Sequence, residues 1–211
     1  MHLTPEQLDA LQELLNIGVG RAAGSLNQML EKPIRLYIPS IRIGPIEELR
    51  KEMDAKVLGL QASVQLPFHG SFSGSTCLLF PTQRAASLVT ILTDEHQDQE
   101  SLNSMKEARL TEIGNIVLNG VMGSLTNVLQ HHLTYSIPFY EETSIHQITQ
   151  PTISDTPDIV LWAQTRFAID DYNISGDILL LMGLQDLGCL LQAVNALLQP
   201  IESCHGPTGK P

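Results

Sequence analysis

The sequence predicts an α+β fold: a single domain built from two pseudo-symmetric α-β-β-β-α repeats, with a mainly antiparallel sheet and long helices packed on it. Three observations predict this fold. Two stretches of the chain match each other at a nearly constant offset, and each copy has the same order of helix and strand signals. Each copy is also too short to bury both faces of a sheet alone, so we expect one joint core.

The internal repeat is clearest in two long helical stretches. The run NIGVGRAAGSLNQML, from Asn16, matches NIVLNGVMGSLTNVL, from Asn115, at an offset of 99 that Pro39 and Pro138 also keep. A later Ser-Gly pair recurs at an offset of 102, which implies a small insertion in the second copy. We predict one domain over residues 1–198, with repeat one over 1–96 and repeat two over 97–198, followed by a disordered tail over 199–211.

Each copy is expected to begin with a long helix and to end with a shorter one. Thr4-Pro5-Glu6-Gln7 is a strong start signal, with Thr as N-cap, Pro at N1 and Gln at N3, and Ser104–Glu107 offers a similar start for the second long helix. The segments 44–54 and 141–158 read as variable polar connections. The expected strands are 34–43, 55–66, 71–80, 135–140, 159–169 and 173–184, with a turn over 170–173 and closing helices over 82–92 and 185–198.

Composition and charge exclude several classes of function. The chain has 23 acidic and 12 basic residues, a net charge of −11, so it repels phosphate backbones and acidic lipids. We therefore expect neither a nucleic-acid partner nor membrane insertion, and basic proteins or basic-rimmed sites are better partners. The longest apolar run, Ile178 to Met182, is far short of the roughly 20 residues that span a bilayer, and the polar N-terminus is not a signal peptide.

The cysteines and histidines predict no metal site. Cys77, Cys189 and Cys204 are far apart and odd in number, which fits buried free thiols in a reducing cytosol and hence a cytoplasmic protein. His131 and His132 are adjacent, so on a helix they point about 100° apart and do not share an ion.

The two long helices are each expected to have a core face and an outer face, given a rotation of about 100° per residue. In the first helix the expected core residues are Leu8, Leu11, Leu15, Ala22, Leu26 and Met29, and the outer ones are Asp9, Glu13, Asn16, Gly20, Ala23, Gly24 and Asn27. In the second, Leu110, Val117, Val121 and Val128 are expected inside, and Glu112, Asn115, Asn119, Gly123 and Thr126 outside.

The glycines of the first helix need an explanation, because a glycine inside a helix costs about 1 kcal/mol relative to alanine. Small residues allow either close internal packing or the approach of a docking partner. For the inward-facing Gly18 we favour packing. For the outward-facing Gly20 and Gly24 we favour docking.

A Glu-x-x-Asn pair lies on the outer face of both helices, as Glu13 with Asn16 and as Glu112 with Asn115. The spacing i, i+3 makes both side chains project together. A single such pair is usually an ordinary solvated helix face. Its recurrence at one offset, on the face opposite the core, favours a functional interpretation, although a recent duplication would preserve the pair as well.

The chemistry available to Glu and Asn favours hydrolysis of an already activated substrate. No Ser, Cys or His lies in register with the pair, so covalent catalysis is disfavoured. An amide can hold a water by donating and accepting hydrogen bonds, and a carboxylate can pair with a partner's Lys or polarise a water. This suffices for an acyl phosphate, where water has only to be placed in line with phosphorus.

These residues resemble the signature of the CheC/CheX/FliY phosphatases of bacterial chemotaxis, Asp/Ser-x3-Glu-x2-Asn-x22-Pro. Asp9, Glu13, Asn16 and Pro39 match it fully. In the second copy Glu112, Asn115 and Pro138 match at the same spacing, but Ala108 stands where Asp or Ser is expected. The similarity covers the chain to about residue 198, and two sites in one chain most resemble a CheC-type protein.

The resemblance implies an enzyme that hydrolyses the phosphoaspartate of a CheY-like response regulator. Asn16 and Asn115 would orient the attacking water, and Glu13 and Glu112 would dock the receiver domain, beside further docking positions at Asp9, Gly20 and Asn119. Pro39 and Pro138 would be structural members of the motif. No cofactor is expected on this chain, because the catalytic Mg2+ would belong to the receiver. The resemblance also implies the receptor deamidase CheD as a possible partner.

Two alternatives remain at this point. One is an adaptor without turnover that binds CheD or a receiver domain. The other is a nucleotide-binding enzyme, suggested by Gly18-x-Gly20-x-x-x-Gly24. It is weak, because these glycines lie within a predicted helix and not at a strand-to-helix loop.

Overall fold

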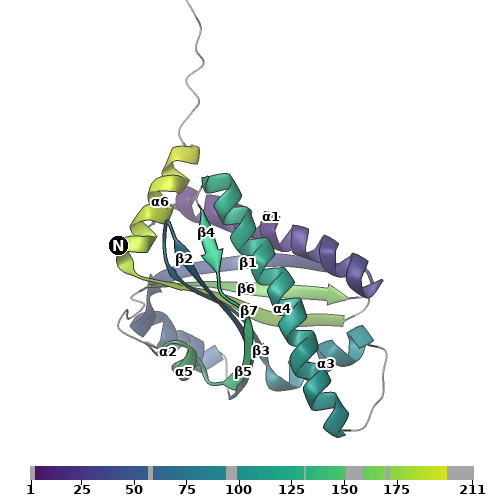
Figure 1. The fold of residues 1–211 in the computed structure, drawn as a ribbon. Coiled ribbons are helices and arrows are strands. Elements are labelled where there is room, and N and C mark those ends of the chain that lie inside the picture. The colour runs from purple at the N-terminus through teal and green to yellow at the C-terminus, as the bar shows by residue number, and fades with distance from the viewer. Residues whose placement is uncertain are drawn as a thin grey trace, which may run out of the picture.

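A computed structural model describes residues 3–56, 59–93, 99–130, 132–150, 159–169 and 172–198. The first copy contains α1 (Pro5–Leu30), β1 (Ile34–Pro45), α2 (Ile46–Lys56), β2 (Gln61–Gly70), β3 (Gly74–Pro81) and α3 (Thr82–Thr93). The second contains α4 (Gln99–Leu129), β4 (Leu133–Tyr135), β5 (Phe139–Thr143), α5 (Ile145–Ile148), β6 (Ile159–Ile169), β7 (Tyr172–Met182) and α6 (Leu184–Leu198). Figure 1 shows the long helices α1 and α4 crossing over one side of a twisted sheet.

The strands form one sheet in the order β1-β6-β7-β3-β2-β4, with β5 also pairing with β2, and all of these pairings are antiparallel. The first strand of each copy therefore pairs with the hairpin of the other copy: β1 with β6, and β4 and β5 with β2. If each strand is replaced by the equivalent strand of the other copy and the sheet is read from the opposite edge, the strand order is unchanged. The predicted α+β class with a mainly antiparallel sheet is confirmed, and this strand order is consistent with the predicted two-fold repeat.

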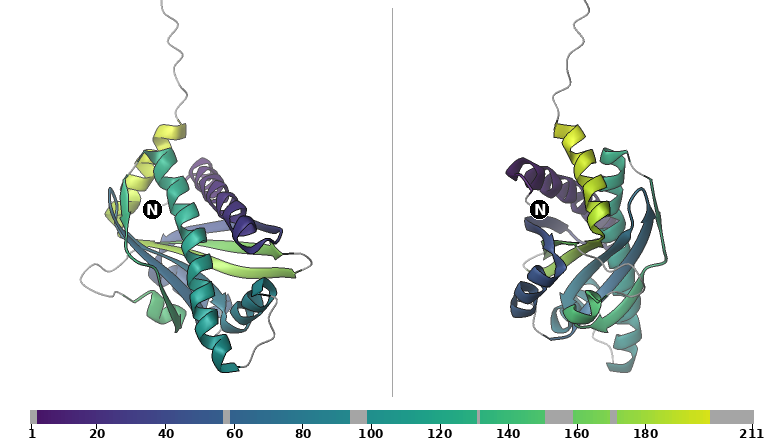
Figure 2. Two further views of the ribbon diagram at one scale, coloured as in Figure 1. Left: turned by 45° about the vertical axis from the view of Figure 1, so that its right-hand side comes forward. Right: turned by 90° about the vertical axis from the view of Figure 1, so that its left-hand side faces the viewer.

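The main core lies between the sheet and the layer of α1, α4, α3 and α6, with a smaller cluster on the opposite face of the sheet under α2 and α5. Figure 2 shows the two layers from the side. In the smaller cluster Trp162 and Leu179 from the sheet pack with Ile46, Met53 and Ile148 from the two short helices. Both helical layers thus use the alternation of the strands, which sends successive side chains to opposite faces.

The start of α1 follows from its sequence. Thr4 is the N-cap, its side chain accepts a hydrogen bond from the backbone N–H of Gln7, and the Gln7 side chain accepts one from the Thr4 N–H. This capping box satisfies two of the otherwise unpaired donors at the helix start. The predicted start at Ser104 is wrong, because α4 already begins at Gln99.

Several other expectations need correction. The polar connection 44–54 contains α2, whose Ile46, Leu49 and Met53 are buried at helical spacing. The strand expected over 135–140 is two strands, β4 and β5, separated around Pro138. Ala23 and Thr126, predicted to face outward, are buried. The turn residues 170–171, the tail 199–211 and the side chain of Val128 lie outside the part of the chain that the structure describes.

Helices α1 and α4 approach each other closely at glycines. A Cβ added to Gly18 would lie 2.6 Å from the Val121 Cα and 2.8 Å from the Gly120 carbonyl oxygen, and one added to Gly120 would lie 2.8 Å from the Gly18 oxygen. No side chain fits between these backbones. The packing role predicted for Gly18 is therefore confirmed, whereas Gly20 and Gly24 have no atom of another segment within 4 Å of such a Cβ.

The cysteines are only partly as predicted. Cys77 is fully buried, and burial raises the pKa of its thiol to about 12. Cys189 is exposed, so the expectation of a buried thiol is wrong there, and Cys204 lies outside the described residues. No described helix combines the length and apolar character that crossing a membrane requires.

Candidate functional site: two Glu-x-x-Asn helix faces

The first predicted site lies where α1 runs beside the free edge of β1. Glu13 and Asp9 are exposed, as is Pro39, and Asn16 is half-buried. The expectation that the Asn16 side chain simply faces solvent is therefore wrong in part. Its carboxamide oxygen accepts a hydrogen bond from the Ile38 backbone N–H (2.8 Å), and its Nδ2 donates to the Ile38 carbonyl oxygen (3.2 Å).

Other α1 side chains bind the same edge. Gln12 donates from Nε2 to the carbonyl oxygens of Ile38 (3.1 Å) and Pro39 (3.2 Å), and Asn27 accepts from the Ile34 N–H (2.6 Å). Because β1 is an edge strand, these groups would otherwise lack strand partners. Amide side chains of α1 thus cover the edge and at the same time fix the orientation of Asn16.

The fixed Asn16 amide keeps unused hydrogen-bonding capacity. A primary amide has two N–H donors and two oxygen lone pairs. Ile38 uses one of each, so one donor and one acceptor remain on the same rigid group. An amide in this state can orient a water molecule without first paying the entropic cost of ordering its own side chain.

The second predicted site is held differently. Asn119 donates from Nδ2 to the Asn115 side-chain oxygen (2.6 Å) and to its carbonyl oxygen (2.8 Å), so an i, i+4 contact on α4 positions the amide. Asn115 is half-buried and Asn119 exposed. The assignment of Asn119 to partner docking stays a prediction, but this bond also makes it a neighbour that orients Asn115.

The strand edge beside the second site is more open. Ile38 is 2% exposed, whereas Ile137, at the equivalent position in the second copy, is 86% exposed. Pro138, which follows it, is half-buried and lies between β4 and β5. The second site therefore has a large apolar side chain at its rim that the first site keeps in the core.

The electrostatic surroundings of the two carboxylates also differ. Glu112 accepts a hydrogen bond from Arg109 Nη1 at 3.2 Å, with both side chains nearly half exposed. Glu13 has no ion pair with any described residue, and Glu6 and Asp9 precede it on α1. A cationic partner would thus meet unpaired carboxylates at the first site and a partly neutralised one at the second.

At the second site, an ion pair joins the edge strand β5 to α4. Lys106 Nζ donates to Glu142 Oε1 on β5 at 2.6 Å, and the Tyr140 hydroxyl donates to the same oxygen at 2.8 Å. The hydrogen bonds from Lys106 and Tyr140 lower the pKa of Glu142, and burial and the neighbouring carboxylate raise that of Tyr140. The sequence offered no signal for this contact, since Lys106 and Glu142 are far apart along the chain.

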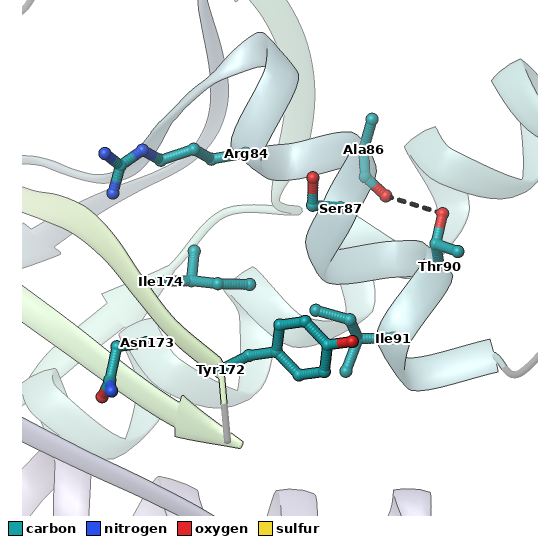
Figure 3. A pocket seen from close by; sticks show the side chains of 8 residues that line it. All are labelled: Arg84, Ala86, Ser87, Thr90, Ile91, Tyr172, Asn173 and Ile174. Atoms are coloured by element: carbon teal, nitrogen blue, oxygen red, sulfur yellow. Dashed lines mark hydrogen bonds between the residues drawn. The ribbon is translucent and has the colours of Figure 1, made fainter. Parts of the chain in front are cut away.

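A separate hollow of about 570 Å³ lies between α3 and the start of β7 (Figure 3). Arg84, Ser87, Thr90 and Ile91 line one side and Tyr172 and Ile174 the other. The two hydroxyls are used inside α3: Ser87 donates to the Gln83 carbonyl and Thr90 to that of Ala86. No residue of either Glu-x-x-Asn pair lines this hollow, so it is not part of the predicted sites.

We predict that Asn16→Ala lowers the free energy of unfolding by about 1–3 kcal/mol, because it leaves the Ile38 N–H without its partner at a part-buried position. Asn115→Ala, which loses only an exposed contact with Asn119, should stay within about 0.5 kcal/mol of wild type. Urea unfolding followed by circular dichroism measures both. Equal losses in the two variants would contradict the structural difference between the sites.

We also predict a pH-dependent contribution from Glu142. Its pKa is lowered from the ordinary value of 4.5, so its contribution to stability is present above pH 4.5 and is lost as the pH falls through the lowered pKa. Glu142→Gln should therefore be less stable than wild type at pH 7, and the difference should shrink at pH 3. The matched control is Glu141→Gln, since Glu141 is exposed; a pH-independent difference for Glu142→Gln would contradict the ion pair's role.

Both sites combine an exposed carboxylate with an amide that a hydrogen bond positions. The described residues contain no group of three or more His, Cys, Asp or Glu side chains that could hold a metal ion. Each of the two long helices carries a carboxylate one helical turn from a fixed carboxamide. The two pairs lie beside opposite edges of the same sheet. The chemistry these groups support is the binding of a cation and the orientation of a water.

Comparisons with solved structures show which known proteins share this fold. The structure of FliY from Thermotoga maritima superimposes with a TM-score of 0.72 at 19% identity, covering 93% of this chain and 99% of that one. The FliM middle domain from H. pylori gives a TM-score of 0.62 at 11% identity, with 90% and 99% covered. At these identities the likeness shows the fold alone, which is that of FliY and of the FliM middle domain.

Sequence comparison finds a chemotaxis protein among the relatives of this chain. The CheY-P phosphatase CheC of Bacillus subtilis (strain 168) is 27% identical over 136 residues, which are 63% of this chain and 65% of that protein. The match thus spans slightly less than two thirds of the relative's length, and no protein-family model matches the chain. The chain is thus similar in sequence to this CheC protein and shares the fold of FliY.

Proposed function

We propose that this protein is an aspartyl-phosphate phosphatase that dephosphorylates a CheY-like response regulator. The observation that best supports the proposal is the Glu-x-x-Asn pair that occurs on both long helices, with the Asn16 amide held rigid while it keeps a free donor and a free acceptor. The name of the Bacillus subtilis relative, CheY-P phosphatase CheC, supports the same substrate.

In the proposed reaction, a water molecule attacks the phosphorus of the receiver's phosphoaspartate. The new P–O bond forms as the bond from phosphorus to the aspartate oxygen breaks, and the products are the free carboxylate and inorganic phosphate, which takes up the proton of the water. Asn16 or Asn115 holds the water in line with the leaving oxygen. The receiver's own Mg2+ would stabilise the charge on the phosphoryl oxygens, and this chain would supply no cofactor.

Glu13 and Glu112 would dock the receiver by pairing with a lysine at its active site. Asp9 adds a second carboxylate one turn earlier at the first site, and Gly20 leaves the following turn low enough for a partner to approach. Since Glu112 is already paired with Arg109, we expect the first site to attract the receiver more strongly. The incomplete motif at Ala108 favours the same order.

An adaptor without turnover is the second candidate. The observation in its favour is that both hydrogen bonds of Asn16 to Ile38 serve the edge of β1, so the residue has a structural role irrespective of catalysis. The partner of such an adaptor would be a receiver domain or the receptor deamidase CheD. In either case we expect a cytoplasmic protein of a chemotaxis pathway.

The experiment that tests the function is phosphate release from the receiver domains encoded in the same genome, each phosphorylated with acetyl phosphate and then freed of the phosphodonor. A phosphatase shortens the lifetime of the phosphoaspartate of at least one receiver. An adaptor binds a receiver, detected by calorimetry, and leaves that lifetime unchanged.

A further inference from the structure

The face of the sheet opposite α1 and α4 is covered over only part of its area. Helices α2 and α5 lie side by side beneath one end of the sheet, where they bury Trp162 and Leu179 (Figure 1). Toward the start of β1 and the end of β6, the same face is formed by Arg35, Tyr37, Gln164, Arg166 and Ser175, none of which is buried. We call these five residues the arginine face.

Strand register places the arginine face as one continuous patch. Tyr37 on β1 is paired with Arg166 on β6, which in turn is paired with Ser175 on β7. Arg35 is paired with Ala168, so Arg35 and Arg166 are diagonal neighbours, a relation that corresponds to about 7–8 Å between Cα atoms. Both arginines are therefore close neighbours of Tyr37 on this face, and Tyr37 is 48% exposed.

The arginine face ends, along β1, at a residue that forms an ion pair with α2. Arg42, further along β1 on the same face, binds Glu52 of α2, and Arg50 of α2 binds Glu47 of the same helix. The nearest carboxylate in register, that of Asp177, accepts a hydrogen bond from Trp162 Nε1 at 2.7 Å. Neither Arg35 nor Arg166 forms an ion pair with a described residue.

Arg35 and Arg166 thus place two positive charges beside each other, without an ion pair to a described residue, in a chain with 23 acidic and 12 basic residues. Arg and Tyr are also the residues enriched at protein interfaces, where Lys and Glu are depleted. An arginine binds a carboxylate through two parallel hydrogen bonds, which gives geometric specificity as well as energy. The positive charge of Arg35 and Arg166 and the distance between them therefore indicate a ligand with two carboxylates at a matching distance.

We propose that the arginine face binds an acidic segment of a partner protein in extended conformation, with carboxylates at positions i and i+2. Such carboxylates lie about 7 Å apart on one side of a strand, which matches the diagonal separation of Arg35 and Arg166. The side chain between them points away, and the segment's backbone lies over Tyr37. Because α1 and α4, which carry the Glu-x-x-Asn pairs, pack on the other face of the sheet, a partner can bind the arginine face while another binds these helices.

The test uses a fluorescein-labelled peptide of sequence Thr-Glu-Val-Glu-Thr-Glu-Val-Glu and the full chain labelled with 15N. We expect chemical-shift changes at residues 35–37 and 164–168, and at least tenfold weaker binding for Arg35→Gln with Arg166→Gln. The matched control is Arg84→Gln, an exposed arginine on α3 with no described ion pair, which should bind the peptide as wild type does.

Three results would overturn the proposal. One is a shift pattern centred away from the arginine face, and another is an equal loss of binding in Arg84→Gln, which would show attraction by charge alone. The third is tighter binding of a 12-nucleotide single-stranded DNA than of the peptide at the same salt concentration, which would assign the face to nucleic acid. Phosphatase activity of the double arginine variant is expected to be unchanged, so this test is independent of the proposed reaction.

Discussion

Asn16→Ala combined with Asn115→Ala is expected to lower the rate of receiver dephosphorylation by at least about 100-fold. The loss of one group that positions a reacting atom or stabilises the transition state typically costs 10²–10³-fold in rate. Here both amides that we propose to orient the water are removed, while Glu13 and Glu112 remain exposed. The measurement is single-turnover decay of the phosphorylated receiver with the variant in excess, at a temperature where circular dichroism shows it folded.

A structural control is needed because Asn16 also binds the edge of β1. Asn27→Ala provides it, since Asn27 accepts the Ile34 N–H on the same edge strand but lies outside the Glu-x-x-Asn motif. We expect Asn27→Ala to lose stability and to keep its dephosphorylation rate. If Asn27→Ala were as inactive as the double variant, the effect of Asn16 would be on the strand edge and not on the water.

The single variants should separate the two sites. Each is expected to retain activity through the remaining copy, and Asn115→Ala should keep more of it, because the first site has unpaired carboxylates and the complete motif. Charge reversal at Glu13 should in turn weaken receiver binding more than it slows the chemical step.

Gly18→Ala is expected to destabilise the protein by about 3 kcal/mol. The added Cβ would lie 2.6 Å from the Val121 Cα and 2.8 Å from the Gly120 oxygen, and these backbone atoms cannot move aside as the end of a flexible side chain can. The two longest helices would have to separate, which exposes part of the main core between them and the sheet. Urea unfolding measures the change.

Gly24→Ala is the matched control for this prediction. Gly24 is on the same helix, but a Cβ there meets no atom of another segment within 4 Å. Removing an exposed helix glycine should increase stability by up to about 1 kcal/mol. An unchanged midpoint for Gly18→Ala, or a loss of the same size for Gly24→Ala, would contradict the close helix crossing.

Local signals in the sequence were sufficient for much of the fold. The capping box at Thr4 predicts the start of α1. The strand 159–169 is predicted with its observed bounds, because an apolar run over 159–163 continues into alternating residues and ends at the turn signal 170–173. Helix α2 was missed although Ile46, Leu49 and Met53 have helical spacing, because the segment between them is strongly polar and follows a Gly-Pro pair.

Features that depend on distant parts of the chain could not be predicted in this way. The pairing of β1 with β6 places each first strand against the hairpin of the other copy, and no local pattern specifies such an exchange. Ala23 is buried because α4 packs beside α1, which widens the buried arc beyond the side facing the sheet. Likewise, the contact of Asn16 with Ile38 joins residues 22 positions apart, so the sequence could suggest the site but not how its amide is held.

Turnover with a catalytic amount of the protein tests the proposed function most directly. One molecule of wild-type protein is mixed with twenty of phosphorylated receiver, and inorganic phosphate is followed over time. We predict that all of the receiver loses its phosphate at least ten times faster than it does alone, with several receivers processed by each molecule. Binding of the receiver without any increase in phosphate release would contradict the assignment of the two Glu-x-x-Asn faces to catalysis and would leave the adaptor.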